Sequence, residues 1–412
     1  MFSGIRGTLA LNCFLTIGLA VGQSGSDVND VITLLFTTQK YNKKVRPLKD
    51  QTMEMDIPVT FYLNSVIEFD EAKEALKTAG FLSLVWIDEY LQWNSSQFNG
   101  IDSIFLPQDD IWKPDISLKN SFASFTGLGS SYLNVYVRNT GEVFWYPYQV
   151  LESTCDVEIR YFPFDVQTCN LKFTAWSYTK TDVDINRGGE NIILSDYMPN
   201  SMWDIQSTAA REVNTDESAV VFEIKLKRKP GFYIINVIVP VVLLSFLNTF
   251  SFVLPITSGE RASYSVTLFL SLAVFLTIVA SSLPKNSDSV SLLSIYLILM
   301  TVASTLIVVL CLVEARLAAR STTDHHIDKG FLFVHKLAKI LRCKTCTRIQ
   351  SVLPHDNTEE NMNKVKDNAG AIVFEDVNWI DIVASMDVLL FIFFMTLTIL
   401  GAFVIFAKAA SH

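Results

Sequence analysis

The hydrophobic and polar positions of the chain follow two patterns, which meet near residue 229. Before that point, short runs of β-branched and aromatic residues alternate with segments rich in Gly, Pro, Asn and Asp. Such runs predict strands, and several short strands at this spacing predict an immunoglobulin-like β-sandwich. Ahead of them, apolar residues at helical spacing predict a short helix over 28–41. The clearest predicted strands are 59–63, 82–86, 133–137 and 220–224.

After residue 229 the pattern changes to four long apolar segments, each long enough to cross a hydrocarbon core of about 30 Å. Very short links join the first three, which predicts antiparallel neighbours in a four-helix bundle. Basic residues gather just after the third segment, as is typical of a cytoplasmic side, so the C-terminus is expected outside. The predicted spans are 232–254, 262–283, 289–313 and 386–407.

The first residues combine Arg6, a short apolar run and small residues before Gln23, which is the pattern of a secretory signal peptide. A short first membrane span is the alternative, although the run is brief for one. We therefore expect an α+β multi-domain membrane protein, with an extracellular sandwich and N-terminal helix followed by a transmembrane bundle. Amphipathic helices are expected at 331–341 and from Glu359 onwards. The predicted divisions are a signal peptide at 1–22, the sandwich at 23–229, three membrane helices at 230–313, a short intracellular domain at 314–385, and the fourth helix with an extracellular end at 386–412.

The composition agrees with a membrane protein, because half of the 412 residues are hydrophobic and only 18% are charged. The net charge of −9 argues against nucleic acid as a partner, since phosphate binding requires clustered Lys and Arg. The sequence has no nucleophile–base arrangement and no metal-ligand motif, so we expect neither an enzyme nor a bound cofactor or metal. Asn94 begins an Asn-Ser-Ser sequon, which predicts glycosylation of an outer domain.

The six cysteines point to one disulfide. Four of them are unsuited to a stable bridge, since two lie in apolar segments and two form a lone Cys-x-x-Cys on the cytoplasmic side: Cys13, Cys311, Cys343 and Cys346. Zinc requires four ligands and only His335 is near that motif, so reduced thiols are expected there, with lipidation left open. The remaining pair, Cys155 and Cys169, lies in the exported part of the chain, where disulfides persist. Their bridge would tie a compact loop beside the membrane.

The second span differs from the others because one of its faces combines hydroxyl and apolar side chains. Hydroxyls can replace part of an ion's hydration shell, and an apolar constriction can close a path by dewetting, so this face predicts a pore lining. The alternative is that the hydroxyls hold neighbouring helices together. Steps of three and four residues place on this face Ser263, Thr267, Leu270, Val274, Thr277 and Ser281.

Glu260, one residue before this span, favours the pore interpretation. In a symmetric oligomer it would form a ring of carboxylates at the inner mouth, which attracts cations and repels anions. Arg261 is expected to point away from the lumen, into helix packing or headgroups. One helix cannot enclose a pore, so a closed ring of subunits is required, and the sequence does not give their number. Acidic residues over 356–387 add weak support for a cation-attracting vestibule, since a solvated helix face is equally ordinary.

Several motifs together resemble the Cys-loop receptors, the pentameric ligand-gated ion channels, and most of all nicotinic acetylcholine receptor subunits. The most specific is the thirteen-residue interval between Cys155 and Cys169, which contains Phe-Pro-Phe-Asp at 162–165. The resemblance implies a homo- or hetero-pentamer in the lipid of the plasma membrane, opened by a small-molecule agonist and conducting monovalent cations, with calcium left open. Further matches are Trp-Lys-Pro-Asp at 112–115, Trp-Ser-Tyr at 176–178, Pro240 in the first span and Gly-Glu-Arg at 259–261.

The resemblance also implies roles for residues of the pore. Leu270 falls at the family's hydrophobic gate, and Glu260 matches the ring that selects cations. The Pro-Ala insertion typical of anion-selective relatives is absent. Ser281 stands where many nicotinic subunits carry an acidic residue, so cations should be less concentrated at the outer mouth.

Only part of the family's aromatic agonist box is present. Trp176 matches its central tryptophan, for which core packing is the alternative role, whereas Lys119 stands in place of a tyrosine and Phe81 in place of a tryptophan. A cation at Lys119 should repel the cationic ligands that such a box attracts. The capping loop, residues 203–221, has neither an adjacent cysteine pair nor an aromatic residue over 204–221. The candidate ligand-binding residues are Phe81, Lys119, Tyr146, Trp176, Tyr178 and Arg211.

The same resemblance implies an ion pair between Glu71 and Arg228 where the two domains meet. The leading hypothesis is a cation channel gated by an extracellular ligand, in which the cysteine loop transmits binding to the Leu270 gate. An accessory subunit without its own agonist site is the first alternative, and a receptor that does not conduct is the second. The residues expected to couple the domains are Glu71, Phe162, Pro163, Phe164, Asp165, Arg228 and Pro284.

Overall fold

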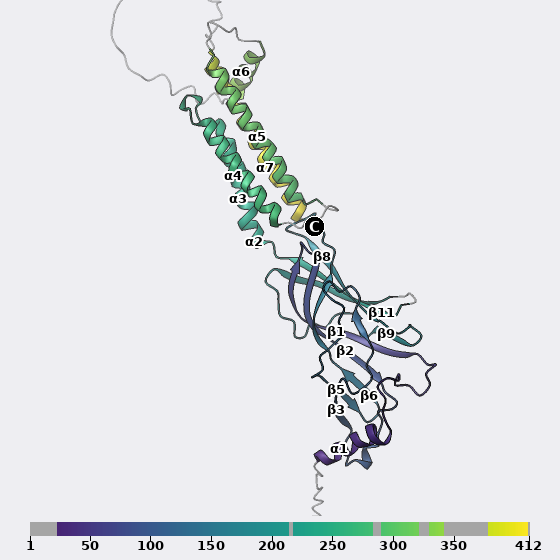
Figure 1. Ribbon diagram of the computed structural model, residues 1–412. Coiled ribbons are helices and arrows are strands. Elements are labelled where there is room, and N and C mark those ends of the chain that lie inside the picture. Colours follow the sequence, from purple (N-terminus) through teal and green to yellow (C-terminus); the bar gives the residue numbers. More distant parts are fainter. Residues whose placement is uncertain (1–22, 214–216, 283–289, 321–328, 342–377, 411–412) are drawn as a thin grey trace, which may run out of the picture.

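The computed structural model describes residues 23–213, 217–282, 290–320, 329–341 and 378–410. Figure 1 shows an elongated molecule with strands at one end and long helices at the other. The predicted signal peptide, Pro284, the Cys343–Cys346 motif and the helix expected from Glu359 lie outside the described residues.

A short helix begins the outer domain, as the sequence predicts, although it starts and ends earlier than expected. Helix α1 (Gly25–Thr33) continues into a wider turn, η1 (Leu34–Thr38). Ser24 caps it, because its side chain accepts a hydrogen bond from the Asp27 backbone N–H and Asp27 returns one. Val31 and Leu35 are fully buried, so the apolar face of this helix covers the end of the sandwich.

The β-sandwich is confirmed. Three of the predicted strands lie within longer strands, and the fourth, predicted over 133–137, corresponds to β5, which is shifted by one residue. The first sheet has the order β3-β5-β6-β2-β1-β9, with β7 also paired to β2, and the second has the order β10-β11-β8-β4. The first sheet is built from β1 (Met55–Asp70), β2 (Ala75–Ile87), β3 (Ser103–Pro107), β5 (Asn134–Arg138), β6 (Glu142–Trp145), β7 (Tyr148–Thr154) and β9 (Val183–Arg187). The second is built from β4 (Ile116–Leu118), β8 (Val166–Ala175), β10 (Trp203–Glu212) and β11 (Ala219–Arg228).

Aromatic rings from both sheets meet in the core between them. Phe61 of β1 lies 6.2 Å from Phe173 of β8 and 5.6 Å from Phe222 of β11, measured between ring centroids. All three rings are almost completely buried. Alternate residues of each strand therefore face this core, and the residues between them face outwards.

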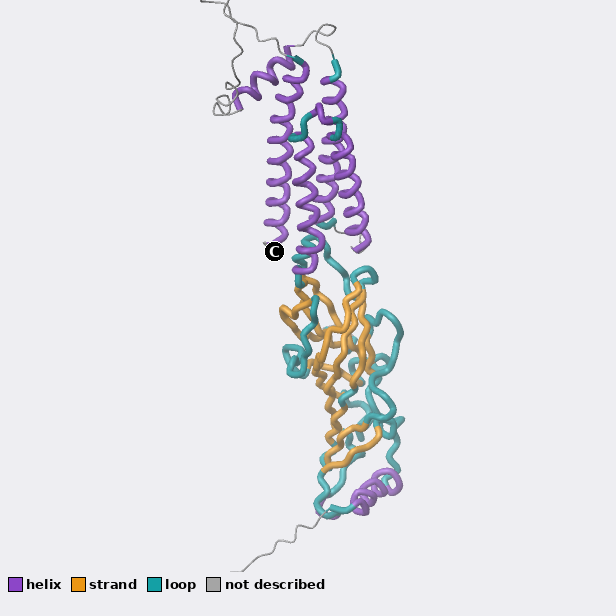
Figure 2. Tube along the Cα trace, turned by 90° about the vertical axis from the view of Figure 1, so that its left-hand side faces the viewer, coloured by secondary structure: helices purple, strands orange, loops and turns teal. Residues whose placement is uncertain are grey.

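Within the described parts of the chain, four helices are long and apolar enough to cross a membrane, as expected, and they lie side by side in Figure 2. The first span covers Gly231–Phe252 and contains α2 (Gly231–Tyr233), η3 (Ile234–Ile238) and α3 (Val239–Thr249). The others are α4 (Arg261–Ser282), α5 (Leu292–Ala318) and α7 (Trp379–Ala410). The amphipathic helix α6 (Lys329–Leu341) lies at the end of the bundle remote from the sandwich, while α7 ends beside the sandwich (Figure 1).

The fourth helix starts earlier than the expected span at 386. Its first turns are buried against Leu317 of α5 and Phe331 of α6 through Trp379, Ile382 and Val383. These apolar contacts stabilise residues 379–385 as part of the helix. Hydropathy missed these residues because Asp381 and Asp387 interrupt the apolar pattern.

Candidate functional site

The predicted pore-lining side chains share one face of α4 that the other helices of this chain leave open. Leu270 and Val274 are both 57% exposed, whereas Leu272 and Val279 on the opposite side are buried. The hydroxyl residues of the stripe are exposed as well, so within the described residues this face does not pack against the chain's own helices. The exposed set is Ser263, Thr267, Leu270, Val274, Thr277 and Ser281.

The hydroxyl groups on this face are oriented by the backbone of their own helix. The Thr267 hydroxyl donates to the carbonyl of Ser263 at 2.8 Å, and the Thr277 hydroxyl donates to the carbonyl of Val274 at 2.7 Å. Each proton is thus directed to the backbone, which leaves the oxygen lone pairs for other partners. The face consequently offers acceptors suited to cations.

Glu260 and Arg261 point in opposite directions. Glu260 is exposed, while the side chain of Arg261 is only 3% exposed and lies 2.9 Å from the carboxylate of Glu314 on α5. Arg261 also pairs with Asp387 on α7. Its guanidinium stacks over Phe252 at 5.3 Å. The positive charge is therefore taken up inside the bundle, as expected from the sequence, and the negative charge remains outside it.

Trp176 projects from the segment that follows β8 and is 56% exposed, so core packing is not its role. Asp115 fixes this segment, because its backbone carbonyl accepts from the Trp176 N–H at 3.3 Å and its carboxylate accepts from the Ser177 N–H at 2.7 Å. The ring of Phe125 lies 4.4 Å from the Trp176 ring. Phe125 was not among the predicted site residues, because it lies in an irregular segment far from Trp176 along the chain.

Tyr178, expected beside Trp176 as a ligand-binding residue, instead packs against the core of the sandwich. Its hydroxyl accepts a hydrogen bond from the indole N–H of buried Trp112 at 3.2 Å. The ring centroids of these two residues are 6.1 Å apart. The Tyr178 side chain is thus anchored to the sandwich core next to Trp176 in the chain.

Lys119 does not present an unopposed charge beside the ligand face. Its ammonium lies 2.7 Å from the carboxylate of Glu217, which also pairs with Lys172 at 3.1 Å. Hydrogen bonds from both lysines lower the pKa of Glu217. Arg211 lies on the same face of the second sheet, since it is directly opposite Val221, which in turn is opposite Lys172.

Phe81 on β2 and Tyr146 in the link between β6 and β7 form an aromatic group with Tyr62 of β1, all at the first sheet. Phe81 stacks on Tyr62 with ring centroids 4.6 Å apart, and Tyr146 meets Phe81 edge-on at 6.2 Å. Trp176 and Lys119 are placed by the second sheet. The two halves of the predicted aromatic box therefore lie on different sheets of one chain.

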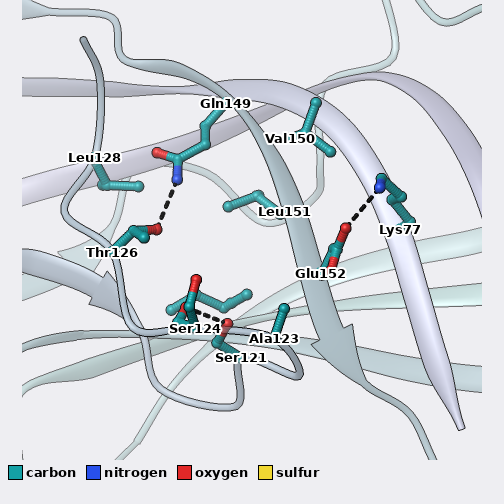
Figure 3. A pocket seen from close by; sticks show the side chains of 11 residues that line it. Lys77, Ser121, Ala123, Ser124, Thr126, Leu128, Gln149, Val150, Leu151 and Glu152 are labelled. Carbon is teal, nitrogen blue, oxygen red and sulfur yellow. Dashed lines mark hydrogen bonds and ion pairs between the residues drawn. The ribbon is translucent and has the colours of Figure 1, made fainter. Parts of the chain in front are cut away.

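A separate hollow of about 410 Å³ lies beneath the segment that follows β4, and Figure 3 shows the side chains around it. Gln149 donates to the hydroxyl of Thr126 at 3.1 Å inside this hollow, and an ion pair between Lys77 and Glu152 stands at its side. None of the predicted ligand-binding residues lines it.

Three carboxylates form the one group among the described residues that has the spacing of a metal site. Oxygens of Glu54, Asp56 and Asp184 lie within 4.8 Å of one another. Asp184 already accepts a hydrogen bond from Ser218 at 2.9 Å. Glu54 and Asp56 are exposed, which is common for acidic groups without an ion.

Arg228 is the centre of the expected coupling contacts. Two of its nitrogens bind Asp165 at 2.7 and 3.0 Å, and a third binds Glu71 at 2.6 Å. The guanidinium also lies 4.3 Å from the Trp203 ring and 4.9 Å from the Phe162 ring. Burial raises the pKa of Glu71 despite the opposing effect of Arg228. The predicted Glu71–Arg228 ion pair is therefore present, and Asp165 holds the arginine more closely.

The cysteine loop contacts the membrane bundle directly. Cys155 and Cys169 form the predicted disulfide, with their Cα atoms 5.0 Å apart. Within the loop, Phe162 is buried among membrane-helix residues and meets the Tyr233 ring at 4.7 Å. The carbonyl of Arg160 accepts from the Leu292 N–H at 3.0 Å, at the start of α5. Pro163 is also buried, whereas Phe164 is partly exposed.

Comparison with known proteins gives matches over both domains. Residues 29–230 match the neurotransmitter-gated ion-channel ligand binding domain, and residues 237–372 match the neurotransmitter-gated ion-channel transmembrane region. Neuronal acetylcholine receptor subunit beta-2 of Carassius auratus is 33% identical over 314 residues, which cover 74% of this chain and 68% of that protein. Acetylcholine receptor subunit epsilon of Xenopus laevis is 32% identical over 379 residues, covering 87% and 73%. Ligand-gated ion channel 4 of Caenorhabditis elegans is 36% identical over 266 residues, covering 62% and 42%.

Proposed function

The chain belongs to the neurotransmitter-gated ion-channel family, as a relative of acetylcholine receptor subunits, and on this premise we propose that it is a subunit of a cation-selective pentamer. Members of this family are membrane-spanning channels with an extracellular ligand-binding domain, and they are not enzymes.

The observation that carries the proposal is the orientation of the residues at the start of α4. Glu260 is exposed, and Arg261 is withdrawn into an ion-pair cluster with two acidic residues of the bundle. With five copies arranged about an axis, Glu260 would form an acidic ring that no adjacent arginine neutralises. Leu270 would form an apolar ring farther along the same face. The pore would be closed at that ring and would open when the α4 helices tilt or rotate.

Ion substitution tests the selectivity. Purified full-length chain is placed in planar bilayers with a KCl gradient, and unliganded openings are collected. The reversal potential is expected near the potassium equilibrium potential, and Glu260→Gln should move it towards zero. Thr257→Ala, a change at an exposed residue of the same turn that leaves the charge intact, is the control. A reversal potential that follows chloride would refute the proposal.

An accessory subunit of a hetero-pentamer is the second candidate, and the ion pair between Lys119 and Glu217 favours it. A charged pair occupies the ligand face where the family resemblance predicts an aromatic box. Native mass spectrometry of the chain expressed alone separates the two candidates. A homopentamer is expected if the chain forms its own channel, and monomers that assemble only with another subunit of the family are expected if it is accessory.

A further inference from the structure

Two lysines from different strands of the second sheet share a single carboxylate. Lys119 follows β4 and Lys172 lies on β8, and their ammonium groups lie 2.7 and 3.1 Å from different oxygens of Glu217. The three side chains are between 27% and 42% exposed, so solvent and solutes reach them. Two ammonium groups that each bind one oxygen form a receptor for a carboxylate, since charge-assisted hydrogen bonds of this kind are the strong ones.

The surroundings of this receptor remain positively charged after Glu217 is counted. Arg211 of β10 is aligned with Lys172 across β11, two strand spacings or about 10 Å away. Lys119, Lys172 and Arg211 therefore carry three positive charges on this face, and Glu217, which pairs with the two lysines, carries one negative charge. Glu223, on the same face but farther along β11, is paired with Lys225 at 3.8 Å. Such a surface disfavours a cationic ligand and favours an anionic one.

An apolar surface lies at the end of the same strand. Trp176 follows Lys172 by four residues, about 13 Å along an extended chain, and lies one residue beyond the end of β8. Trp176 and Phe125 are 56% and 55% exposed, with their rings 4.4 Å apart. Long lysine and tryptophan side chains shorten the gap between charge and rings. The site thus offers one end for an anion and another for an apolar body.

We infer that this face binds a small organic carboxylate with an apolar body, whose carboxylate takes the place of Glu217 between Lys119 and Lys172. The inference rests on the proposed function, because it assigns a ligand class to the ligand-gated site of the outer domain. Glu217 lies two residues before the start of β11, the strand that ends at Arg228. Release of Glu217 by a ligand therefore acts on the strand that leads to the coupling contacts.

Three probes of one shape and different charge test the inference: 3-phenylpropionate, the neutral 3-phenylpropanamide and the cationic 3-phenylpropylamine. Each is titrated into the full-length chain in lipid nanodiscs, and the dissociation constant is measured by calorimetry. The carboxylate is expected to bind about tenfold more tightly than the amide, and the amine more weakly than either. Glu217→Gln removes the internal competitor, so it should tighten carboxylate binding about fivefold and leave amide binding unchanged.

Glu223→Gln is the matched control, since it removes the same charge from the same face without contacting Lys119 or Lys172. Lys172→Gln should abolish the preference for the carboxylate, and Lys172→Arg should retain most of it. The inference is overturned if Glu217→Gln behaves like Glu223→Gln, if the amine binds best, or if no probe binds at millimolar concentration. The assay measures equilibrium binding and does not depend on ion flux. Carboxylate binding can therefore be found in a chain that conducts no ions, and a chain that proves to be a cation channel can still fail to bind the carboxylate.

Discussion

At the membrane end of the sandwich, the single side chain of Arg228 binds both Asp165 and Glu71. It is buried together with Asp165, whose side chain is 2% exposed, while Glu71 retains 14% exposure. A buried ion pair contributes little by itself, because desolvation offsets the attraction, but loss of one partner leaves a buried charge uncompensated. The two acids should therefore differ in importance according to their burial and hydrogen bonds.

Asp165→Asn is accordingly expected to destabilise the outer domain more than Glu71→Gln. Asp165 makes two hydrogen bonds to Arg228 and Glu71 makes one. Loss of the more buried charge should cost about 3 to 5 kcal/mol, and loss of Glu71 clearly less. Thermal unfolding of the two variants in detergent checks this, with Glu68→Gln on the exposed side of β1 as control. Equal losses for both variants would contradict the assignment.

Asp88, which directly follows β2, provides a pH-dependent contribution to the stability of the sandwich. Its side chain is buried and accepts hydrogen bonds from the Tyr41 hydroxyl at 2.7 Å and the Tyr90 N–H at 2.9 Å. Burial raises its pKa from 3.8 to about 6. The folded chain therefore binds a proton more tightly than the unfolded chain does. Its contribution is fully present below pH 3.8 and is lost as the pH rises through about 6.

The melting temperature of the wild type relative to Asp88→Asn should hence fall as the pH rises from 4 to 7, by an amount equivalent to about 3 kcal/mol. Asp110→Asn, at an exposed carboxylate of the same domain, is the control substitution over the same range. A constant difference for Asp88→Asn would show that its carboxyl titrates as in the unfolded chain.

At the scale of elements, two leucines of α4 lie on opposite faces of the helix and have different roles. Leu270 is 57% exposed on the open face, and Leu272 is 2% exposed in the cluster that includes α3 and α5 residues. A hydrophobic constriction closes a path because water leaves it, and a hydroxyl at the same place retains water.

Leu270→Ser should therefore raise the basal sodium flux of proteoliposomes severalfold, with little change in melting temperature. Leu272→Ser is the matched control, since the same substitution in the packed face should lower the melting temperature by opening a cavity, at about 2 to 5 kcal/mol, without a comparable flux. Unchanged flux in Leu270→Ser, from a preparation that conducts when opened, would remove Leu270 from the gate.

The elements that the sequence predicts well are those specified by contiguous residues. Long apolar runs defined the membrane helices, and the hydroxyl stripe of α4 followed from helical spacing alone. Contacts between distant residues were not predictable from pattern, because nothing local pairs Lys119 with Glu217, 98 residues away, or Arg261 with Asp387, 126 residues away. The latter contact explains how α7 includes Asp387, since a buried arginine compensates a carboxylate that hydropathy counts against a membrane span. The packing of Tyr178 against the sandwich core was not predictable for a related reason, since a motif match does not give side-chain direction.

At the scale of the whole molecule, the two domains meet at the cysteine loop. The described residues include one outer-domain side chain within the hydrophobic cluster of the membrane helices, that of Phe162. It packs against Tyr233 of α2 and under the guanidinium of Arg228. The disulfide loop thus joins the end of β11 to the first membrane helix, which is the place where a change in the outer domain would reach the bundle.

Phe162→Ala should separate the unfolding of the two domains while leaving each folded. Removal of the ring takes away the shared apolar contact, so calorimetry should resolve two thermal transitions where the wild type has overlapping ones. Phe164→Ala, two residues away in the same loop and in neither the sandwich core nor the membrane cluster, is the control and should retain the wild-type profile. If the two variants behave alike, the domains are coupled through the Arg160–Leu292 backbone contact rather than through the ring of Phe162.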